Sequence, residues 1–254
     1  MVWLVKNTKL VLPVVYLMEA TGVYYENLAW FLHNNNCNVS VILPNKAKKY
    51  KEALGLRSKN DRIDAKSLAQ MACEQNNTAW KPLSSNIYSL RLITRQIQAI
   101  SNQSTAFKNQ LHALEYGIHR DKDIEKMYDN QVKLLKKSKQ SLQLKVENIV
   151  EKDEILKRKF NNIGKIKGLG LQTLAVIIAE TNGFAAFQNI GQLVSYAGYD
   201  IIENQSGKRN GKTRISKKGN NHIRRCLHFA AFNMIKYEVA PFKNLYERVY
   251  EKIR

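Results

Sequence analysis

Residues 58–69 read SKNDRIDAKSLA, and this stretch predicts the start of a helix that carries two carboxylates. Asn60 is a suitable N-cap, and Asp61 lies where the positive end of the helix dipole favours negative charge. Asp61 and Asp64 are three residues apart, so they share one helical face, which continues into apolar Leu68. Two carboxylates at the edge of an apolar face favour a divalent-cation site. The alternative is a helix start whose acids bind no ion.

The composition indicates a globular protein that binds a polyanion. The chain has 254 residues, enough for two domains, and a formal net charge of +20. A protein this basic usually binds nucleic acid. A membrane surface is the rival partner, but no apolar run approaches the roughly 20 residues that a membrane span needs. Cys37, Cys73 and Cys226 are scattered and odd in number, which indicates a reducing compartment without a disulfide framework or a zinc motif.

The residues before Asp61 predict an α/β layer. Short runs rich in Val and Ile, at 14–18 and 39–43, indicate buried strands. Helical patterns follow them at 24–33 and 46–54, and the Asp61 helix extends to about Glu74. Alternating strands and helices imply a parallel pair of strands. Glu19 follows the first strand, at the carboxyl end where functional residues of such sheets gather.

After Pro82 the sequence predicts long helices, because Gly117 is the one glycine before Gly164. Apolar residues recur every seven positions, with charges between them, which is typical of a coiled coil. They are Tyr128, Leu135, Leu142, Ile149, Leu156 and Ile163. We expect this segment to separate two domains and to pair with another copy of the chain. The alternative is a helix that packs against its own domain.

Residues 161–180 indicate a helix–hairpin–helix motif. A helix end is followed by Gly168-Leu169-Gly170 and then by an apolar helix. Glycines let the backbone approach a phosphate, and the N-terminus of the following helix favours that anion. Lys165 and Lys167 add positive charge. The alternative is an ordinary tight turn between two helices. Residues 184–199 predict a further helical segment.

The densest basic region runs from 208 to 225, where eight Lys or Arg residues occur without any Asp or Glu. They are Lys208, Arg209, Lys212, Arg214, Lys217, Lys218, Arg224 and Arg225. Glycines within the region indicate a flexible loop that leads into a helix. Such a loop suits neutralisation of a nucleic-acid backbone, and a merely solvated basic face is the alternative.

Ser206 stands at the start of this loop, between Gln205 and Gly207, beside the cations. A serine in such surroundings could act as a nucleophile toward phosphorus. From the residues alone, a turn serine is the alternative. His222 and His228 follow nearby, and lone helical histidines are more often structural.

Together these motifs resemble the insertion-sequence transposases of the IS-one-ten family, relatives of the Piv-type DNA invertases. The resemblance rests first on MEATGVY (18–24) and KNDRIDA (59–65). Later motifs follow in the same order: GLG (168–170), YAG (196–198), QSGK (205–208), ISKKGN (215–220) and IRRCL (223–227). The resemblance covers nearly the whole chain.

The resemblance implies three domains: a RuvC-like domain of RNase H fold (1–82), a coiled-coil linker (83–160) and a helical C-terminal domain (161–254). In the family, four acids in the order Asp, Glu, Asp, Asp hold Mg²⁺. Glu19, Asp61 and Asp64 match the last three of these acids. The C-terminal domain carries a nucleophilic serine, which Ser206 matches and for which Ser216 is the second candidate.

The resemblance also implies partners and a location. DNA is the substrate, a structured RNA encoded by the element is a further partner, and the chain forms homo-oligomers in the bacterial cytoplasm at the nucleoid. No acidic residue precedes Glu19, so the sequence resembles a member truncated at its N-terminus, and at its C-terminus too. We therefore expect the chain as written to be inactive. The rival functions are a Holliday-junction nuclease that uses water and a non-catalytic helix–hairpin–helix DNA-binding protein.

Overall fold

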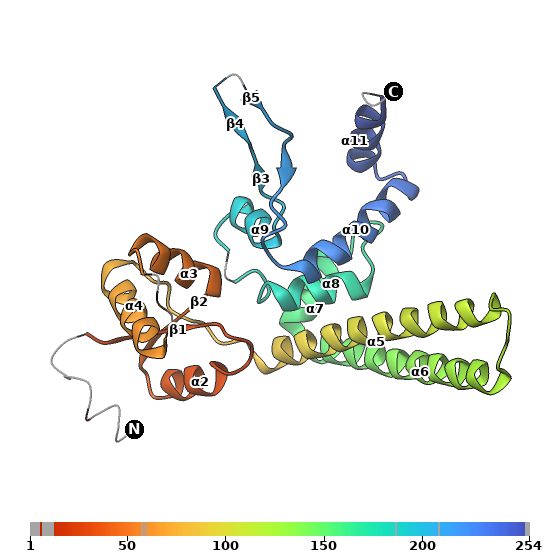
Figure 1. Ribbon diagram of the computed structural model, residues 1–254, viewed down its shortest axis with the longest axis horizontal. Coiled ribbons are helices and arrows are strands. Elements are labelled where there is room, and N and C mark those ends of the chain that lie inside the picture. The colour runs from red at the N-terminus through yellow and green to blue at the C-terminus, as the bar shows by residue number, and fades with distance from the viewer. Residues whose placement is uncertain are drawn as a thin grey trace. The chain divides into compact units, whose positions relative to one another are not determined.

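The computed structural model describes residues 6, 13–56, 58, 60–185, 187–207 and 209–251, with residues 209 and 210 described by their backbone alone. The chain divides into two compact units, unit 1 (Met1–Pro82) and unit 2 (Leu83–Arg254) (Figure 1). In the ranges just given, no helix is long and apolar enough to cross a membrane.

Unit 1 contains the expected parallel pair of strands. β1 (Val15–Glu19) pairs with β2 (Asn38–Ile42) in parallel, with Glu19 opposite Ile42. From residue 13 onward, the helices of this unit are α2 (Glu26–Asn34), α3 (Pro44–Ala53) and α4 (Asp61–Glu74). The predicted order of strands and helices is confirmed, with boundaries that differ by a few residues.

The alternation of side chains along the strands places helices on both faces of the pair. Val39 packs with Ala29 and Leu32 of α2. Ile42, three residues later on β2, packs instead with Ala47 of α3 and Met71 of α4. Because successive strand residues point to opposite faces, the short run can be apolar almost throughout. Packing of α2 on one face and of α3 and α4 on the other thus fixes the position of the strands and of their carboxyl ends.

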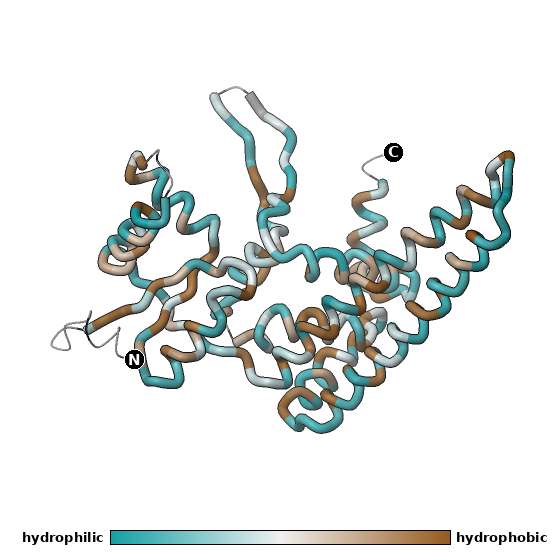
Figure 2. Tube along the Cα trace, turned by 60° about the horizontal axis from the view of Figure 1, so that its bottom comes forward, coloured by the Kyte–Doolittle hydropathy of each residue, from teal (hydrophilic) through white to brown (hydrophobic). Residues whose placement is uncertain are grey.

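Unit 2 begins with a long helical hairpin of α5 (Ser85–Glu115) and α6 (Lys122–Lys152). Brown and teal segments alternate along both helices, as expected for helices with one apolar side (Figure 2). Leu142 and Ile149 pack against the core of the unit, and the Tyr128 ring lies 5.7 Å from that of Phe107 on α5. These positions of the seven-residue repeat therefore pack within the chain. Pairing of the segment with another copy stays a prediction.

The helix does not continue through the whole repeat. Asp153 ends α6 and caps α7 (Glu154–Ile163), because its carboxylate accepts hydrogen bonds from the backbone N–H groups of Ile155 and Leu156. α7 is followed by α8 (Leu171–Glu180), α9 (Ile190–Ala197), α10 (Asn221–Lys236) and α11 (Ala240–Glu251). α8 is the central helix, because Leu174, Ala175 and Ile178 are buried in the core. Among the described residues of the helical segment predicted at 184–199, only those of α9 are helical.

The segment that carries Ser206 is a β-hairpin and not the flexible loop that the glycines suggested. β3 (Ile201–Ile202) pairs with β6 (Arg214–Ile215), and β4 (Gln205–Ser206) pairs with β5 (Arg209–Asn210), both antiparallel. Gly207 adopts a φ of 56° just after β4. A left-handed glycine there is the conformation that a two-residue hairpin turn requires. The turn glycine therefore forms the hairpin that the sequence interpretation took for irregular structure.

Candidate functional site

The three predicted carboxylates of unit 1 lie at the end of β1 and at the start of α4. Glu19 is half-buried and accepts a hydrogen bond of 3.2 Å from the Thr21 hydroxyl. Asp61 is the exposed first residue of α4, which Asn60 caps by accepting the Ile63 N–H at 2.8 Å. Asp64, one turn later, is 2.7 Å from the ammonium of Lys51 on α3. The predicted cap and helix start are thus confirmed.

The donor atoms of these carboxylates suit Mg²⁺, although the three described side chains are not gathered in one cluster. Carboxylate oxygens are the ligands that this hard cation prefers. Among the described residues, however, no three His, Cys, Asp or Glu side chains gather closely enough to hold a metal ion. The positive charge next to Asp64 is supplied by Lys51. A metal ion at Asp64 would have to replace that ammonium.

The two candidate serines differ in what surrounds their hydroxyls. Ser206 is exposed on β4, immediately before the turn at Gly207. Ser216 is half-buried; its hydroxyl donates to the Asp200 carboxylate at 2.6 Å and accepts the Lys218 N–H at 3.2 Å. The Ser216 hydroxyl is thus used to shape a turn, and that of Ser206 faces solvent.

The cations of the basic region fall into three groups. Lys212, Arg214, Lys217 and Lys218 are exposed along or beside the hairpin. Arg224 is half-buried, and its guanidinium donates to the carbonyl of Ala197 at 2.7 Å, which caps the end of α9. Arg225 is exposed on α10. Lys208 lies outside the described residues, and only the backbone of Arg209 is described.

The glycines of the predicted helix–hairpin–helix motif have different surroundings. Gly168 has a φ of 95°, and a Cβ there would lie 3.0 Å from the backbone nitrogen of Met234 on α10. This glycine is therefore required by helix packing. Gly170 is the N-cap of α8, and a Cβ there would meet nothing within 4 Å. Gly170, at the α8 N-terminus, is therefore the glycine of this turn with free space around it. Lys165 and Lys167 are exposed.

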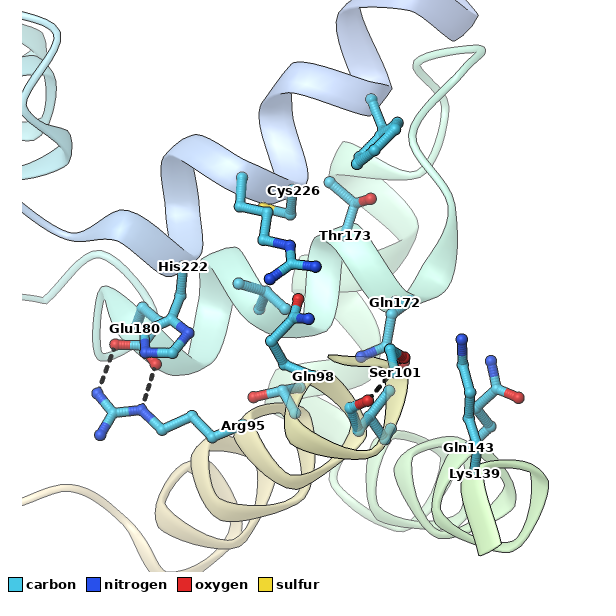
Figure 3. A pocket seen from close by; sticks show the side chains of 15 residues that line it. Arg95, Gln98, Ser101, Lys139, Gln143, Gln172, Thr173, Glu180, His222 and Cys226 are labelled. Carbon is cyan, nitrogen blue, oxygen red and sulfur yellow. Dashed lines mark hydrogen bonds and ion pairs between the residues drawn. The ribbon is translucent and has the colours of Figure 1, made fainter. Parts of the chain in front are cut away.

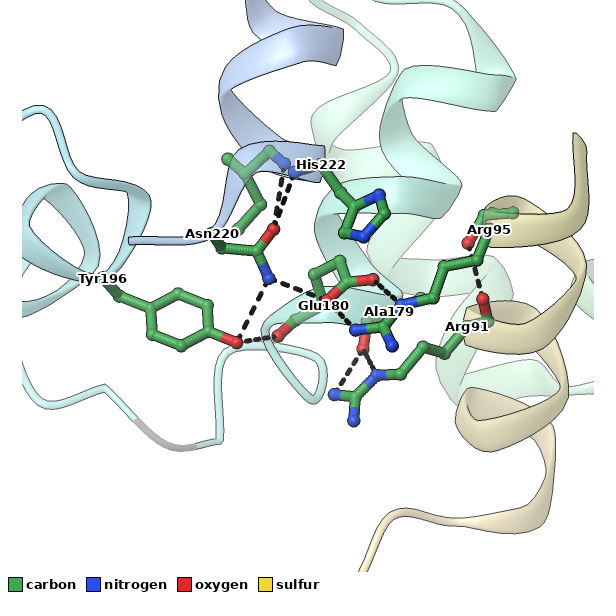
Figure 4. A network of polar contacts seen from close by, with 9 residues as sticks. Arg91, Arg95, Ala179, Glu180, Tyr196, Asn220 and His222 are labelled. Carbon is green, nitrogen blue, oxygen red and sulfur yellow. Dashed lines mark hydrogen bonds and ion pairs between the residues drawn. The ribbon is translucent and has the colours of Figure 1, made fainter. Parts of the chain in front are cut away.

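A polar network around the buried Glu180 joins the hairpin's end to the helical core (Figure 4). Arg95 of α5 donates to both oxygens of Glu180, at 2.8 and 3.0 Å. The Asn220 amide donates to Glu180 at 2.7 Å, and the Asn220 side-chain oxygen caps α10. The Tyr196 hydroxyl donates to the Glu180 carbonyl. Asn220 ends the segment that carries the hairpin, so Glu180 fixes where that segment returns to the core.

Burial and hydrogen bonding act in opposite directions on the ionisation of this network. Burial alone would raise the pKa of Glu180, but hydrogen bonds from Arg95 and Asn220 outweigh it and hold that pKa below its ordinary value. Burial lowers the pKa of His222, at the start of α10, so that its neutral form is favoured. Both effects keep the charge pattern of the folded network fixed near neutral pH.

The sequence interpretation missed this network. The signal was an acid, Glu180, directly after the apolar run 174–179. A carboxylate at the end of a buried helix needs a cationic partner. The partner, Arg95, is 85 residues away, and no local pattern marks it.

Comparisons with known proteins cover both units. The profile described as "Transposase IS116/IS110/IS902 family" matches residues 161–247, and a profile of DEDD-type IS110 transposases matches residues 3–118. This chain belongs to the IS110 family of transposases. The family expected from the motifs is therefore confirmed.

Two curated relatives extend the similarity across both matched regions. They are the pilin gene-inverting proteins of Moraxella bovis and Moraxella lacunata. Each is 25% identical over 238 residues, which are 93% of this chain and 72% of the relative. The DEDD-type match contains Glu19, Asp61 and Asp64, and the second match contains both candidate serines and the basic hairpin. The candidate residues therefore all lie within the regions that define this transposase family.

Proposed function

We propose that this IS110-family transposase cleaves and transfers DNA strands with Ser206 as its nucleophile. The observation that supports this choice is the contrast between the two serines. Ser206 is exposed on the hairpin that also carries the exposed Lys212 and Arg214, whereas the Ser216 hydroxyl is engaged with Asp200. A nucleophile has to reach a phosphodiester, and surrounding cations offset the charge that develops on it.

In the proposed reaction the Ser206 oxygen forms a bond to phosphorus as its proton leaves. The bond between phosphorus and one deoxyribose oxygen breaks, and that oxygen takes up a proton. The DNA strand is then joined to the enzyme through a phosphoserine diester. A hydroxyl of the recipient strand attacks the same phosphorus, and Ser206 departs with a proton. The bond energy is retained, so no phosphodiester is lost by hydrolysis.

Glu19, Asp61 and Asp64 are the residues that would hold Mg²⁺ in this proposal, in a domain of RNase H type. The ion, when bound, would polarise the scissile phosphate. Asp64 would then exchange the Lys51 ammonium for the cation. The sequence carries three carboxylates of the four-acid pattern, which led to the expectation of an inactive chain. The proposed activity departs from that expectation, and the assay below measures whether three carboxylates suffice.

Further partners belong to the same proposal. An RNA encoded by the element would select the DNA sites, and the chain would act as an oligomer at the bacterial nucleoid. The surface of α6 supports self-association, because Met127 and Leu134 are seven residues apart and are 50% and 58% exposed. Two such residues on one helical face suit pairing with a second copy of the hairpin.

The test is a trapped protein–DNA adduct formed with a nicked substrate that lets the released strand diffuse away. The wild-type chain with Mg²⁺ should give a denaturation-resistant adduct, and the Ser206→Ala variant should give none. Ser216→Ala is the matched control and should retain the adduct. An adduct that survives in Ser206→Ala would refute the proposed nucleophile.

The same assay separates the rival functions. A Holliday-junction nuclease that uses water would cleave the substrate without any adduct and would be insensitive to Ser206→Ala. A non-catalytic DNA-binding protein would show salt-sensitive binding that Asp61→Ala and Asp64→Ala leave unchanged, with no cleavage in Mg²⁺.

A further inference from the structure

Unit 2 contains a cleft with both apolar and charged walls between the α5–α6 hairpin and helices α8 and α10 (Figure 3). The cleft has a volume of about 360 Å³. Arg95, Lys139 and Arg225 bring three positive charges to its walls, and Glu180 brings one negative charge. With His222 neutral, the lining carries a net charge of +2. Because Arg95 is already paired with Glu180, the charges of Lys139 and Arg225 remain for an anion.

The cleft also presents amide groups. Gln143 of α6 and Gln172 of α8 both line it. Within the part of the chain that the structure describes, neither amide has a hydrogen-bond partner, and Lys139 and Arg225 have neither a hydrogen-bond nor an ion-pair partner. An amide offers a donor and an acceptor side by side, which is the pattern that the edge of a nucleobase requires. Phe229, which is 64% exposed, lines the same cleft and offers an aromatic face.

A second cavity continues the cleft along the hairpin. Its volume is about 340 Å³, and it shares Ser101 and Lys139 with the first. Lys108 and Lys136 add two positive charges there, and no acid lines it. A pocket with amides and an aromatic ring therefore adjoins a basic groove with hydroxyl groups. This arrangement suits a single nucleic-acid strand, because a base can occupy the pocket while the neighbouring phosphates lie along the basic groove.

We propose that this cleft receives one unpaired base of a single-stranded nucleic acid, with the adjoining phosphates along the groove at Lys139, Lys136 and Lys108. The volume of the cleft is close to the roughly 300 Å³ at which small-molecule pockets begin, so the cleft can hold one base but not a duplex. This inference rests on the proposed nucleic-acid partner, but it concerns a region without the candidate nucleophile. It assigns a binding role to the α5–α6 hairpin.

The test compares two probes that carry the same phosphates. Fluorescent single strands of oligothymidine and of abasic deoxyribose phosphate, equal in length, are titrated with the full chain. The wild type should bind the base-bearing strand about tenfold more tightly, which is within the range for one stacked base. The double variant Gln143→Ala, Gln172→Ala should lose most of this preference. Gln131→Ala, Gln140→Ala is the matched control on exposed positions of α6 and should keep it.

A second variant tests the phosphate track separately. Lys139→Gln should weaken binding of both probes and reduce the slope of log affinity against log salt by about one. Lys133→Gln, an exposed change on the same helix, should alter neither. An oligouridine strand distinguishes RNA from DNA as the preferred ligand. Equal affinity for base-bearing and abasic strands, or equal effects of test and control variants, would overturn the inference.

The outcome is independent of the strand-transfer proposal. If the Ser206 adduct forms but the glutamine and lysine variants bind normally, the cleft assignment fails and the nucleophile assignment stands. If binding falls in those variants but no adduct forms, the cleft stands and strand transfer by Ser206 fails.

Discussion

The two units each contain a cross-helix carboxylate–cation pair, and the two pairs differ in burial and in bonding. In unit 1, one oxygen of Asp64 meets Lys51 at 2.7 Å, and the two side chains are 32% and 23% exposed. In unit 2, the 48% exposed Arg95 donates to both oxygens of Glu180, and it is the Glu180 carboxylate that is buried, at 1% exposed. Glu180 also accepts from Asn220. Asp64 therefore has one ion-pair partner, Lys51. Glu180 instead accepts hydrogen bonds on both of its carboxylate oxygens.

This difference indicates which carboxylate can exchange its partner. A partly exposed lysine pair contributes roughly 0–1 kcal/mol and can give way to another cation. A buried carboxylate that loses its partners leaves unsatisfied groups in the interior. We therefore expect Asp64 to be available for ligand binding and Glu180 to be structural. The predictions below test that division.

The largest expected effect is on stability, from Glu180→Ala. The change removes the buried carboxylate to which both Arg95 and Asn220 donate, so the free energy of unfolding of unit 2 should fall by roughly 1–3 kcal/mol. Denaturant titration followed by circular dichroism measures this. Glu147→Ala, an exposed change on α6, is the control and should have little effect. Equal losses in the two variants would contradict a structural role for Glu180.

The pH dependence of stability should show the same network. Folding lowers the pKa of His222 below its ordinary 6.5, so as the pH falls this imidazole takes up a proton in the unfolded chain before it does so in the folded chain. The stability of the fold therefore decreases as the pH drops below the ordinary pKa of 6.5. The pKa of Glu180 is below its ordinary 4.5, so its contribution is present above that value and is lost at lower pH. Thermal melting temperatures should thus fall in two stages from pH 7 to pH 3. In Glu180→Gln the lower stage should shrink, and an unchanged profile would refute this assignment.

The smallest effect on stability is expected from Lys51→Met, which should change the unfolding free energy by no more than about 1 kcal/mol. Its effect on metal binding should be opposite in sign. With the competing ammonium gone, Mn²⁺ should bind several-fold more tightly, as measured by electron paramagnetic resonance of the free ion. Lys48→Met is the control, since Lys48 pairs with Glu52 and not with Asp64. Unchanged Mn²⁺ affinity in Lys51→Met would show that Asp64 does not exchange its partner.

The sequence predicted the parts of the fold that depend on local chemistry. The α4 helix begins after the Asn60 cap and ends at Glu74, as its pattern indicated. The parallel strands were recognisable because helices on both faces make short strands apolar throughout. The segment 184–199 was predicted poorly because only its second half has a cap, at Asn189.

The candidate site was predictable in its residue types and not in its contacts. The carboxylates and Ser206 could be selected because the motifs that surround them are local. The partners that distinguish them are distant in sequence: Lys51 for Asp64 and Asp200 for Ser216. Side chains of that kind are brought together by tertiary packing, for which a single sequence contains no direct signal.

The Glu180 network also has a consequence for the order of folding. It joins Arg95 to Glu180 across 85 residues and Glu180 to Asn220 across 40 residues. The α5–α6 hairpin needs only the short turn between its helices, so it can form from neighbouring residues. Contacts that close long loops must overcome more chain entropy, and they form later. Asn220 therefore docks after the hairpin of α5 and α6 exists, and the segment that carries Ser206 is among the last parts of unit 2 to be anchored.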